Sequence, residues 1–184
     1  PDGGGPNDQL PAPLVQRQGP PADLLLRSAG LLDPAGEIEG KHDLLVEGGR
    51  ISRIADPGTI DPPEGTEVID AEGLHVFPAF FDPHVHLRTP GQEYKEDLET
   101  GTRSAAAGGY AGLLAMANTS PPVSEPEQIE ALRDRAARVA SVPVGFLATV
   151  THGMKGEELT NMAELRQVGA VGFTDDGVPV ESTR

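Results

Sequence analysis

The feature that most limits how this chain can fold is a regular alternation of short apolar segments with segments of helical pattern, which begins near residue 74. The apolar segments predict strands at residues 74–81, 110–116, 143–149 and 170–173. The segments between them predict helices at residues 93–107, 127–140 and 157–168. Alternating strands and helices form a parallel sheet with helices packed outside it. Because four such units are half of a (β/α)₈ barrel, the sequence predicts an α/β fold containing the N-terminal part of a TIM barrel.

The residues before this alternation have a different composition. Residues 1–21 are rich in Pro, Gly and Gln, and they carry too little apolar surface to offset the entropy of ordering, so a flexible tail is expected there. Residues 22–73 contain short strand candidates separated by Gly, Pro and Asp, and Gly48-Gly49 predicts a hairpin turn. The predicted organisation is a tail (1–21), a small β-sandwich module (22–73) and the first half of a barrel (74–184).

Composition excludes several classes of function. With 14 basic and 29 acidic side chains, the formal charge of -15 argues against a nucleic-acid partner. No apolar stretch approaches the roughly 20 residues of a membrane-spanning helix, and no signal peptide is evident, so neither a membrane partner nor export is expected and a cytoplasmic location is predicted. The chain has no cysteine, so any metal would be bound by His nitrogen and carboxylate oxygen.

A histidine pair follows the first apolar segment, in the run Asp82-Pro83-His84-Val85-His86. Side chains in a strand alternate between faces, so both imidazoles can reach one ion at the end of what is expected to be a buried strand. Asp176 follows the fourth segment, and in a barrel functional groups collect where the strands end. Two histidines and an aspartate are ligand types of a hydrolytic zinc centre, so His84, His86 and Asp176 are the predicted metal ligands.

Other polar residues at the same strand ends allow two interpretations. Arg88 could bind a substrate carboxylate through its guanidinium fork, or form a salt bridge at the rim. Asn118 could donate to the same carboxylate or cap the following loop. The pair Asp175-Asp176 could supply a ligand or only form a turn into Gly177.

Three further histidines are candidates of lower weight. His152 lies where a third ligand could lie, although a loop histidine is more often an ordinary surface residue. His42 and His75 have no chemical partner nearby in the sequence and are interpreted as structural.

Several motifs resemble those of a known family from about Asp23 to the last residue, in order and with similar spacing. They are Pro78-Ala79-Phe80-Phe81-Asp82-Pro83-His84-Val85-His86-Leu87-Arg88-Thr89-Pro90-Gly91, Tyr94-Lys95-Glu96, Glu99-Thr100-Gly101, Met116-Ala117-Asn118-Thr119 and Gly172-Phe173-Thr174-Asp175-Asp176-Gly177. The sequence resembles the amidohydrolase superfamily, and specifically the bacterial class I dihydroorotases. It departs from the family pattern at Ala79, Thr89 and Ala117, where that family usually has Gly, Glu and Pro.

The resemblance implies a function and a site. The implied reaction is the reversible, zinc-dependent cyclisation of N-carbamoyl-L-aspartate to L-dihydroorotate in pyrimidine biosynthesis, with two zinc ions per complete active site. It makes His84, His86 and Asp176 metal ligands, and it places His86, Arg88 and Asn118 at substrate-binding positions. It also implies a homo-oligomer, with possible association with aspartate carbamoyltransferase.

Two alternatives stay open. One is another cyclic-amide hydrolase, such as an allantoinase or hydantoinase; hydantoinases, however, carry a carboxylated lysine on strand 4, and residues 170–177 contain no lysine. The other is a non-catalytic dihydroorotase homologue that supports aspartate carbamoyltransferase.

The remaining residues of the implied site have no counterpart in the sequence. Two histidines from strands 5 and 6, and an aspartate from strand 8 that acts as proton shuttle, would lie beyond Arg184. No catalytic residue is therefore assigned within the chain, which is expected to be an incomplete fragment with little or no activity by itself.

Overall fold

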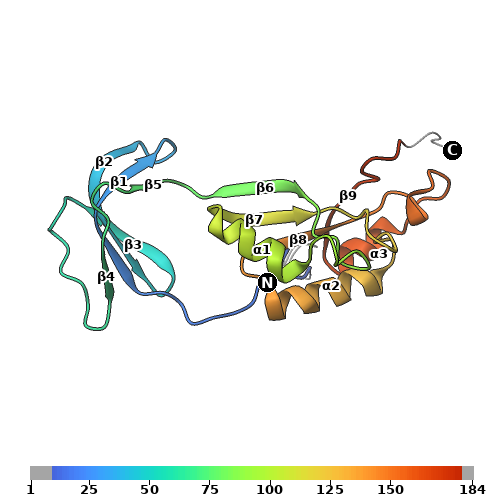
Figure 1. Cartoon of the computed structure of the whole chain (residues 1–184), viewed down its shortest axis with the longest axis horizontal. Helices are drawn as coiled ribbons and strands as arrows, with labels where there is room; N and C mark the ends of the chain where they lie inside the picture. Colours follow the sequence, from blue (N-terminus) through green and yellow to red (C-terminus); the bar gives the residue numbers. More distant parts are fainter. Residues whose placement is uncertain (1–9, 180–184) are drawn as a thin grey trace, which may run out of the picture. The chain divides into compact units, whose positions relative to one another are not determined.

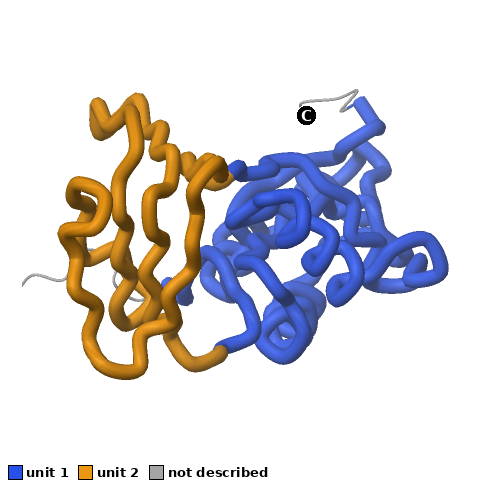
Figure 2. Tube along the Cα trace, turned by 60° about the vertical axis from the view of Figure 1, so that its left-hand side comes forward, with its two compact units in different colours: residues 1–18, 80–184 blue, residues 19–79 orange. Residues whose placement is uncertain are grey.

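The computed structural model describes residues 10–179 and divides the chain into two compact units. Unit 1 contains residues 1–18 and 80–184, and unit 2 contains residues 19–79 (Figure 2). Among the described residues, no helix combines the length and the apolar character needed to cross a membrane. The domain boundaries drawn from the sequence stay a prediction.

Unit 2 is built on one five-stranded mixed sheet. Its strands are β1 (Leu24–Asp33), β2 (Ile38–Glu47), β3 (Arg50–Ala55), β4 (Glu67–Asp70) and β5 (His75–Val76). The order is β3-β2-β1-β4, and β5 also pairs with β1. Gly48 and Gly49 both have positive φ, which glycine adopts without steric cost, and they connect the antiparallel strands β2 and β3 as predicted.

A buried carboxylate in unit 2 accepts hydrogen bonds from the bulge of β1 and from the loop after β3. Asp43 is fully buried, and its side chain accepts hydrogen bonds from the backbone N–H of Ser28 at 3.0 Å and of Gly58 at 2.9 Å. Ser28 lies at the β-bulge of β1, where its φ is 57°. Arg27 adds a 3.4 Å ion pair, so the buried charge has several partners.

Unit 1 contains a parallel sheet of four strands in sequential order (Figure 1). The strands are β6 (Phe80–Val85), β7 (Tyr110–Ala115), β8 (Val144–Ala148) and β9 (Ala170–Phe173). A helix lies between each strand and the next: α1 (Leu98–Ala107), α2 (Pro126–Val139) and α3 (Met162–Gln167). This is the predicted alternation of strands and helices, with every strand end pointing to the same edge of the sheet.

The predicted strand at residues 74–81 is wrong in its bounds and in its burial. The apolar run divides between two sheets: β5 pairs with β1 in unit 2, whereas β6 starts at Phe80 and pairs with β7. Phe80 and Phe81 are 51% and 50% exposed, so β6 is not a buried strand among the described residues. Pro83 lies inside β6 where the register with β7 is irregular, as expected for a residue that cannot donate to the ladder.

Two helices begin later than the sequence predicts because polar side chains cap them. At the start of α1, the carboxylate of Asp97 accepts a hydrogen bond from the backbone N–H of Thr100. At the start of α3, the side chain of Asn161 accepts one from the backbone N–H of Glu164. The bond from Thr100 lowers the pKa of Asp97. The Asp97 cap therefore contributes stability above the pKa of the unfolded chain, and loses it as the pH falls through the lowered value.

The core of unit 1 lies between the sheet and its helices. Fully buried side chains from the helices, such as Leu98, Ile129 and Leu165, join Leu113, Val144 and other strand residues in one apolar cluster. Because side chains in a strand alternate, the neighbours of these strand residues face the opposite side of the sheet.

On that opposite side, a glycine stands beside a large apolar side chain in three successive strand pairs. The register pairs are Phe81 with Gly112, Leu114 with Gly145, and Leu147 with Gly172. A Cβ atom added to each glycine would lie 2.7 or 2.8 Å from its partner's side chain, well inside the optimal carbon separation. We call these the large–glycine pairs.

Part of the segment predicted as a flexible tail is hydrogen-bonded to unit 1. Val15 forms an antiparallel bridge with Val144, in which each N–H donates to the other residue's carbonyl at 2.9 Å. Arg17 donates its N–H to the Ala140 carbonyl at 3.0 Å. The first nine residues of the predicted tail lie outside the described residues.

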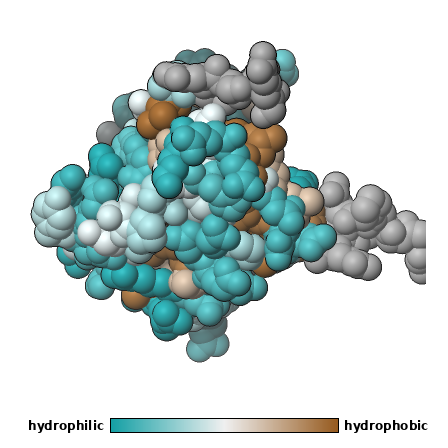
Figure 3. Space-filling model, turned by 90° about the vertical axis from the view of Figure 1, so that its right-hand side faces the viewer, coloured by the Kyte–Doolittle hydropathy of each residue, from teal (hydrophilic) through white to brown (hydrophobic). Residues whose placement is uncertain are grey.

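The surface carries the polarity expected from the net charge of -15. On the face shown in Figure 3, hydrophilic side chains predominate and hydrophobic ones gather in smaller patches.

Candidate metal centre

The two predicted imidazole ligands lie at the end of β6. His84 is inside the strand and His86 follows it, so strand alternation turns both rings to the same side. Their centroids are 5.2 Å apart and their planes meet at 68°. The carboxylate of Asp82 accepts from the backbone N–H of His84 at 3.0 Å, which fixes the strand end that carries the rings.

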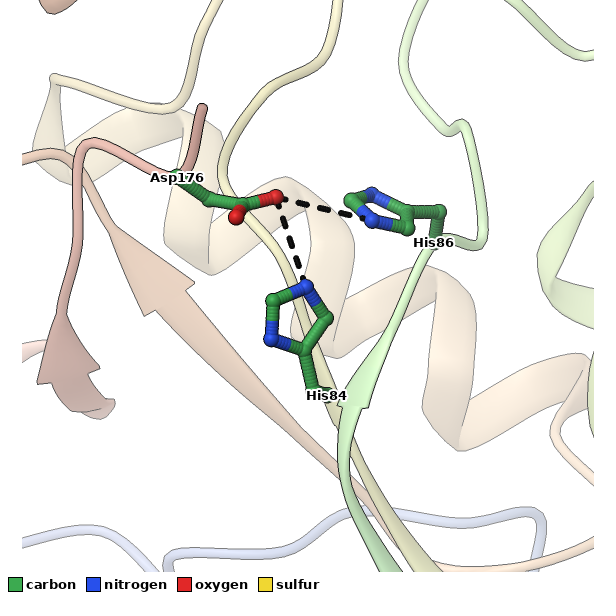
Figure 4. Close-up of side chains that lie close together, drawn as sticks. All are labelled: His84, His86 and Asp176. Carbon is green, nitrogen blue, oxygen red and sulfur yellow. Dashed lines mark ion pairs between the residues drawn. The ribbon is translucent and has the colours of Figure 1, made fainter. Parts of the chain in front are cut away.

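Asp176 follows β9, the strand at the opposite edge of the four-stranded sheet from β6, and its side chain points toward this histidine pair. Its Oδ2 lies 3.4 Å from His84 Nε2 and 3.5 Å from His86 Nε2 (Figure 4). In a flat sheet β6 and β9 would be about 14 Å apart, so the curvature of the sheet and the loop after β9 bring the three side chains together. The structure thus places residues 90 positions apart in the sequence on one site.

The donor set fits a metal ion. All three residues offer a ligand atom, and these atoms lie within 4.8 Å of one another. Ligands bound tetrahedrally at about 2.0–2.1 Å are roughly 3.3 Å apart, close to the two distances from Asp176. Side-chain exposures of 55% for His84, 30% for His86 and 23% for Asp176 leave access to the site.

Asn118 connects two members of the group. It follows β7, and its Oδ1 lies 2.9 Å from His86 Nδ1. Its Nδ2 donates to Asp176 Oδ2 at 3.1 Å. The sequence suggested that Asn118 either contacts a substrate or caps a loop. It did not predict these bonds to the proposed metal ligands.

Arg88 does not continue the strand pattern. β6 ends at Val85, and Arg88 has a left-handed backbone with φ 53°. The alternation of side chains along a strand therefore does not determine where the Arg88 side chain points. Within residues 10–179 the guanidinium forms neither an ion pair nor a hydrogen bond, so the rim salt bridge is not formed there.

The other histidines lie outside the group. His152 Nδ1 is 3.1 Å from Glu125 Oε1, and both side chains are substantially exposed. His42 and His75 belong to unit 2.

Asp175, for which the sequence allows either a ligand or a turn residue, anchors the loop that carries Asp176. The expected turn does form, since Val178 donates its N–H to the Asp175 carbonyl at 2.8 Å and Gly177 has φ 83°. The buried carboxylate also accepts from Val150 N–H at 2.8 Å, and from the N–H and the hydroxyl of Thr151. This pairing has no local sign in the sequence, because Val150 and Thr151 lie 25 and 24 positions before Asp175.

Replacing Asp175 with alanine is expected to lower the free energy of unfolding by about 3 kcal/mol, because it leaves buried donors on Val150 and Thr151 without an acceptor. Urea unfolding measures this loss. Asp175→Asn keeps one acceptor oxygen and should lose less, and Glu157→Ala, an exposed change in the nearby loop, should leave the midpoint nearly unchanged. Equal midpoints for Asp175→Ala and Glu157→Ala would contradict the anchoring role.

The sequence of this chain matches a known protein family and several curated proteins. Residues 73–184 match the family model described as dihydro-orotase-like. The chain is 44% identical over 161 residues to the dihydroorotase of Streptococcus pneumoniae, covering 88% of this chain and 37% of that protein. It is 42% identical over 157 residues to the dihydroorotase of Aquifex aeolicus, covering 85% of this chain and 36% of that protein. The chain therefore spans under two fifths of the length of these curated relatives.

Solved structures give the fold. The L-hydantoinase (dihydropyrimidinase) of Arthrobacter aurescens matches with a TM-score of 0.68 and 23% identity, over 83% of this chain and 32% of that one. The D-hydantoinase (dihydropyrimidinase) of a Thermus species matches with a TM-score of 0.58 and 30% identity, over 70% and 28%. These matches and the parallel sheet confirm the predicted α/β fold, part of an amidohydrolase barrel with a β-rich module. The chain belongs to the dihydro-orotase-like family.

Proposed function

We propose that the protein carrying this chain is a metal-dependent dihydroorotase, which interconverts N-carbamoyl-L-aspartate and L-dihydroorotate. The observation that carries the proposal is the convergence of His84, His86 and Asp176 where the parallel strands end. The relatives named dihydroorotase, at 42% and 44% identity, support this substrate over others.

The proposed metal is zinc, with two ions in the complete site. His84, His86 and Asp176 would hold it, because imidazole nitrogen and carboxylate oxygen suit zinc and the chain has no thiolate. When bound, zinc lowers the pKa of a coordinated water to near 7 and polarises a carbonyl oxygen.

The proposed role of Arg88 is to bind the substrate carboxylate. Arg88 is half-buried and its guanidinium has no partner within residues 10–179, so its paired N–H donors are free for a bidentate bond. His86 and Asn118 would complete the substrate contacts. Holding the carboxylate at a fixed point orients the ring amide toward the three-residue group, and such orientation contributes to rate.

A cyclic-amide hydrolase of another specificity is the second candidate, favoured by the hydantoinases among the structural matches. Asp176 weighs against it, since residues 170–177 offer no lysine for the hydantoinase pattern. A homo-oligomer and association with aspartate carbamoyltransferase stay predictions.

The test compares substrates with and without a carboxylate in the zinc-loaded protein. Arg88→Lys is expected to raise KM for L-dihydroorotate at least about tenfold, because lysine cannot form the bidentate pair, whereas Arg103→Lys on the exposed face of α1 should not. Turnover of hydantoin or allantoin without turnover of L-dihydroorotate would favour the second candidate. Zinc binding without turnover of any of these amides would point to a non-catalytic homologue.

A further inference from the structure

We propose that Asn118 is a positioning residue of the metal centre, which fixes the tautomer of His86 and the orientation of Asp176. The inference rests on the metal site of the proposed function, and it concerns metal binding rather than the choice of substrate. Both polar atoms of the Asn118 amide contact predicted metal ligands, His86 just after β6 and Asp176 after β9.

The first step concerns the proton on His86. An amide oxygen only accepts hydrogen bonds, so the 2.9 Å contact between Asn118 Oδ1 and His86 Nδ1 requires the proton to be on Nδ1. A neutral His86 then has its lone pair on Nε2, the atom that lies 3.5 Å from Asp176 Oδ2. Asn118 therefore leaves the metal-facing nitrogen free to act as a ligand.

The second step concerns the direction of the amide. If the amide were turned over, its oxygen would face the Asp176 carboxylate oxygen and its NH₂ would face His86. Two acceptor oxygens at about 3 Å repel each other, so the presence of the carboxylate selects the orientation in which Nδ2 donates to Asp176. One amide thus orients a histidine and an aspartate at the same time.

The third step concerns the rigidity of the loop that carries Asn118. The carbonyl of the preceding Ala117 accepts from the N–H groups of Thr119 at 2.9 Å and Val123 at 3.0 Å. Ala117 is fully buried, and the Thr119 hydroxyl donates to the Pro121 carbonyl at 2.6 Å. The backbone on both sides of Asn118 is therefore fixed, which limits how far the amide can move from the two ligands.

This role is compatible with substrate binding. Nδ2 carries two hydrogens, and the bond to Asp176 uses one of them. The second hydrogen stays available to a substrate carboxylate, so one residue can connect metal binding with substrate binding.

The experiment uses the whole protein that carries this chain, and it measures zinc affinity by calorimetry and the tautomer of His86 by long-range ¹H–¹⁵N NMR of the metal-free form. Asn118→Ala is expected to weaken zinc binding about 10- to 100-fold and to give a mixture of His86 tautomers. Asn118→Asp retains an acceptor for Nδ1–H and should keep the Nδ1–H tautomer, although it loses the donor to Asp176. Asn161→Ala removes an asparagine that caps α3, and it should leave both readouts unchanged.

The outcomes separate this inference from the proposed function. Unchanged zinc affinity and tautomer in Asn118→Ala, with a raised KM for L-dihydroorotate, would make Asn118 a substrate contact alone and overturn the inference. Weakened zinc binding with a shifted tautomer, in a protein that turns over no dihydroorotate, would support the inference and count against the proposed function.

Discussion

Replacing Asp176 with alanine is expected to lower zinc affinity at least about 100-fold, a larger loss than changes beside the ligands usually cause. Asp176 is the only anionic member of the three-residue group, and its Oδ2 lies 3.4 Å from His84 Nε2 and 3.5 Å from His86 Nε2. Its loss leaves two neutral imidazoles, and it also removes the acceptor for Asn118 Nδ2. Competition with a chromophoric chelator measures the affinity.

Two variants make this result specific. Asp176→Asn keeps the size of the side chain but removes its charge, so it should bind zinc more weakly than the original chain and still fold normally. Glu130→Gln removes one charge from the exposed face of α2 and should leave zinc affinity unchanged. If Asp176→Ala and Glu130→Gln bound zinc equally well, the three residues would not form the metal site.

Replacing Gly91 with alanine is expected to lower the free energy of unfolding by about 4 kcal/mol, the sum of steric overlap and a left-handed backbone. Gly91 has φ 84°, and an added Cβ atom would lie 1.8 Å from the Ser120 carbonyl oxygen. Ser120 donates its N–H to the Pro90 carbonyl at 3.1 Å, so the loop after Arg88 contacts the loop after Asn118. Neither backbone can move without breaking this contact.

Chemical unfolding of the purified chain measures the loss. Gly153→Ala is the matched control, because Gly153 is also left-handed with φ 61° but its nearest neighbour to an added Cβ is a flexible lysine at 3.6 Å. Its cost should be only about 1–2 kcal/mol, the part due to the backbone. Similar losses for the two variants would show that the approach to Ser120 carries no cost.

The order of strands and helices in unit 1 could be predicted from the sequence because the hydrophobic pattern is local. β9 has the predicted bounds, β7 ends one residue earlier than predicted, and β8 is shorter than predicted by one residue at each end. The strand that carries the histidines was misplaced because an apolar run does not specify which sheet each residue joins. Phe80 pairs with β7 in unit 1, whereas Val76 pairs with β1 in unit 2.

The predicted metal ligands could be proposed from the sequence because strand ends gather at one edge, and the structure brings His84, His86 and Asp176 together there. The contacts that orient these three side chains could not be predicted from the sequence. The bonds of Asn118 and Asp175 join residues 24 to 58 positions apart, and they depend on the register of neighbouring strands. No local pattern of residue types encodes such distances.

The large–glycine pairs of unit 1 have a consequence for how this sequence can evolve. In each pair the space above the glycine is filled by a side chain of the neighbouring strand, so Phe81 and Gly112 share one volume, as do Leu114 with Gly145 and Leu147 with Gly172. A larger residue can enter at the glycine only if the partner side chain becomes smaller or moves away, and at Gly145 the side chains of Leu14 and Val171 are nearly as close as Leu114. These six positions should therefore covary in pairs among homologues, and each pair should be exchanged as one module when the sheet is redesigned.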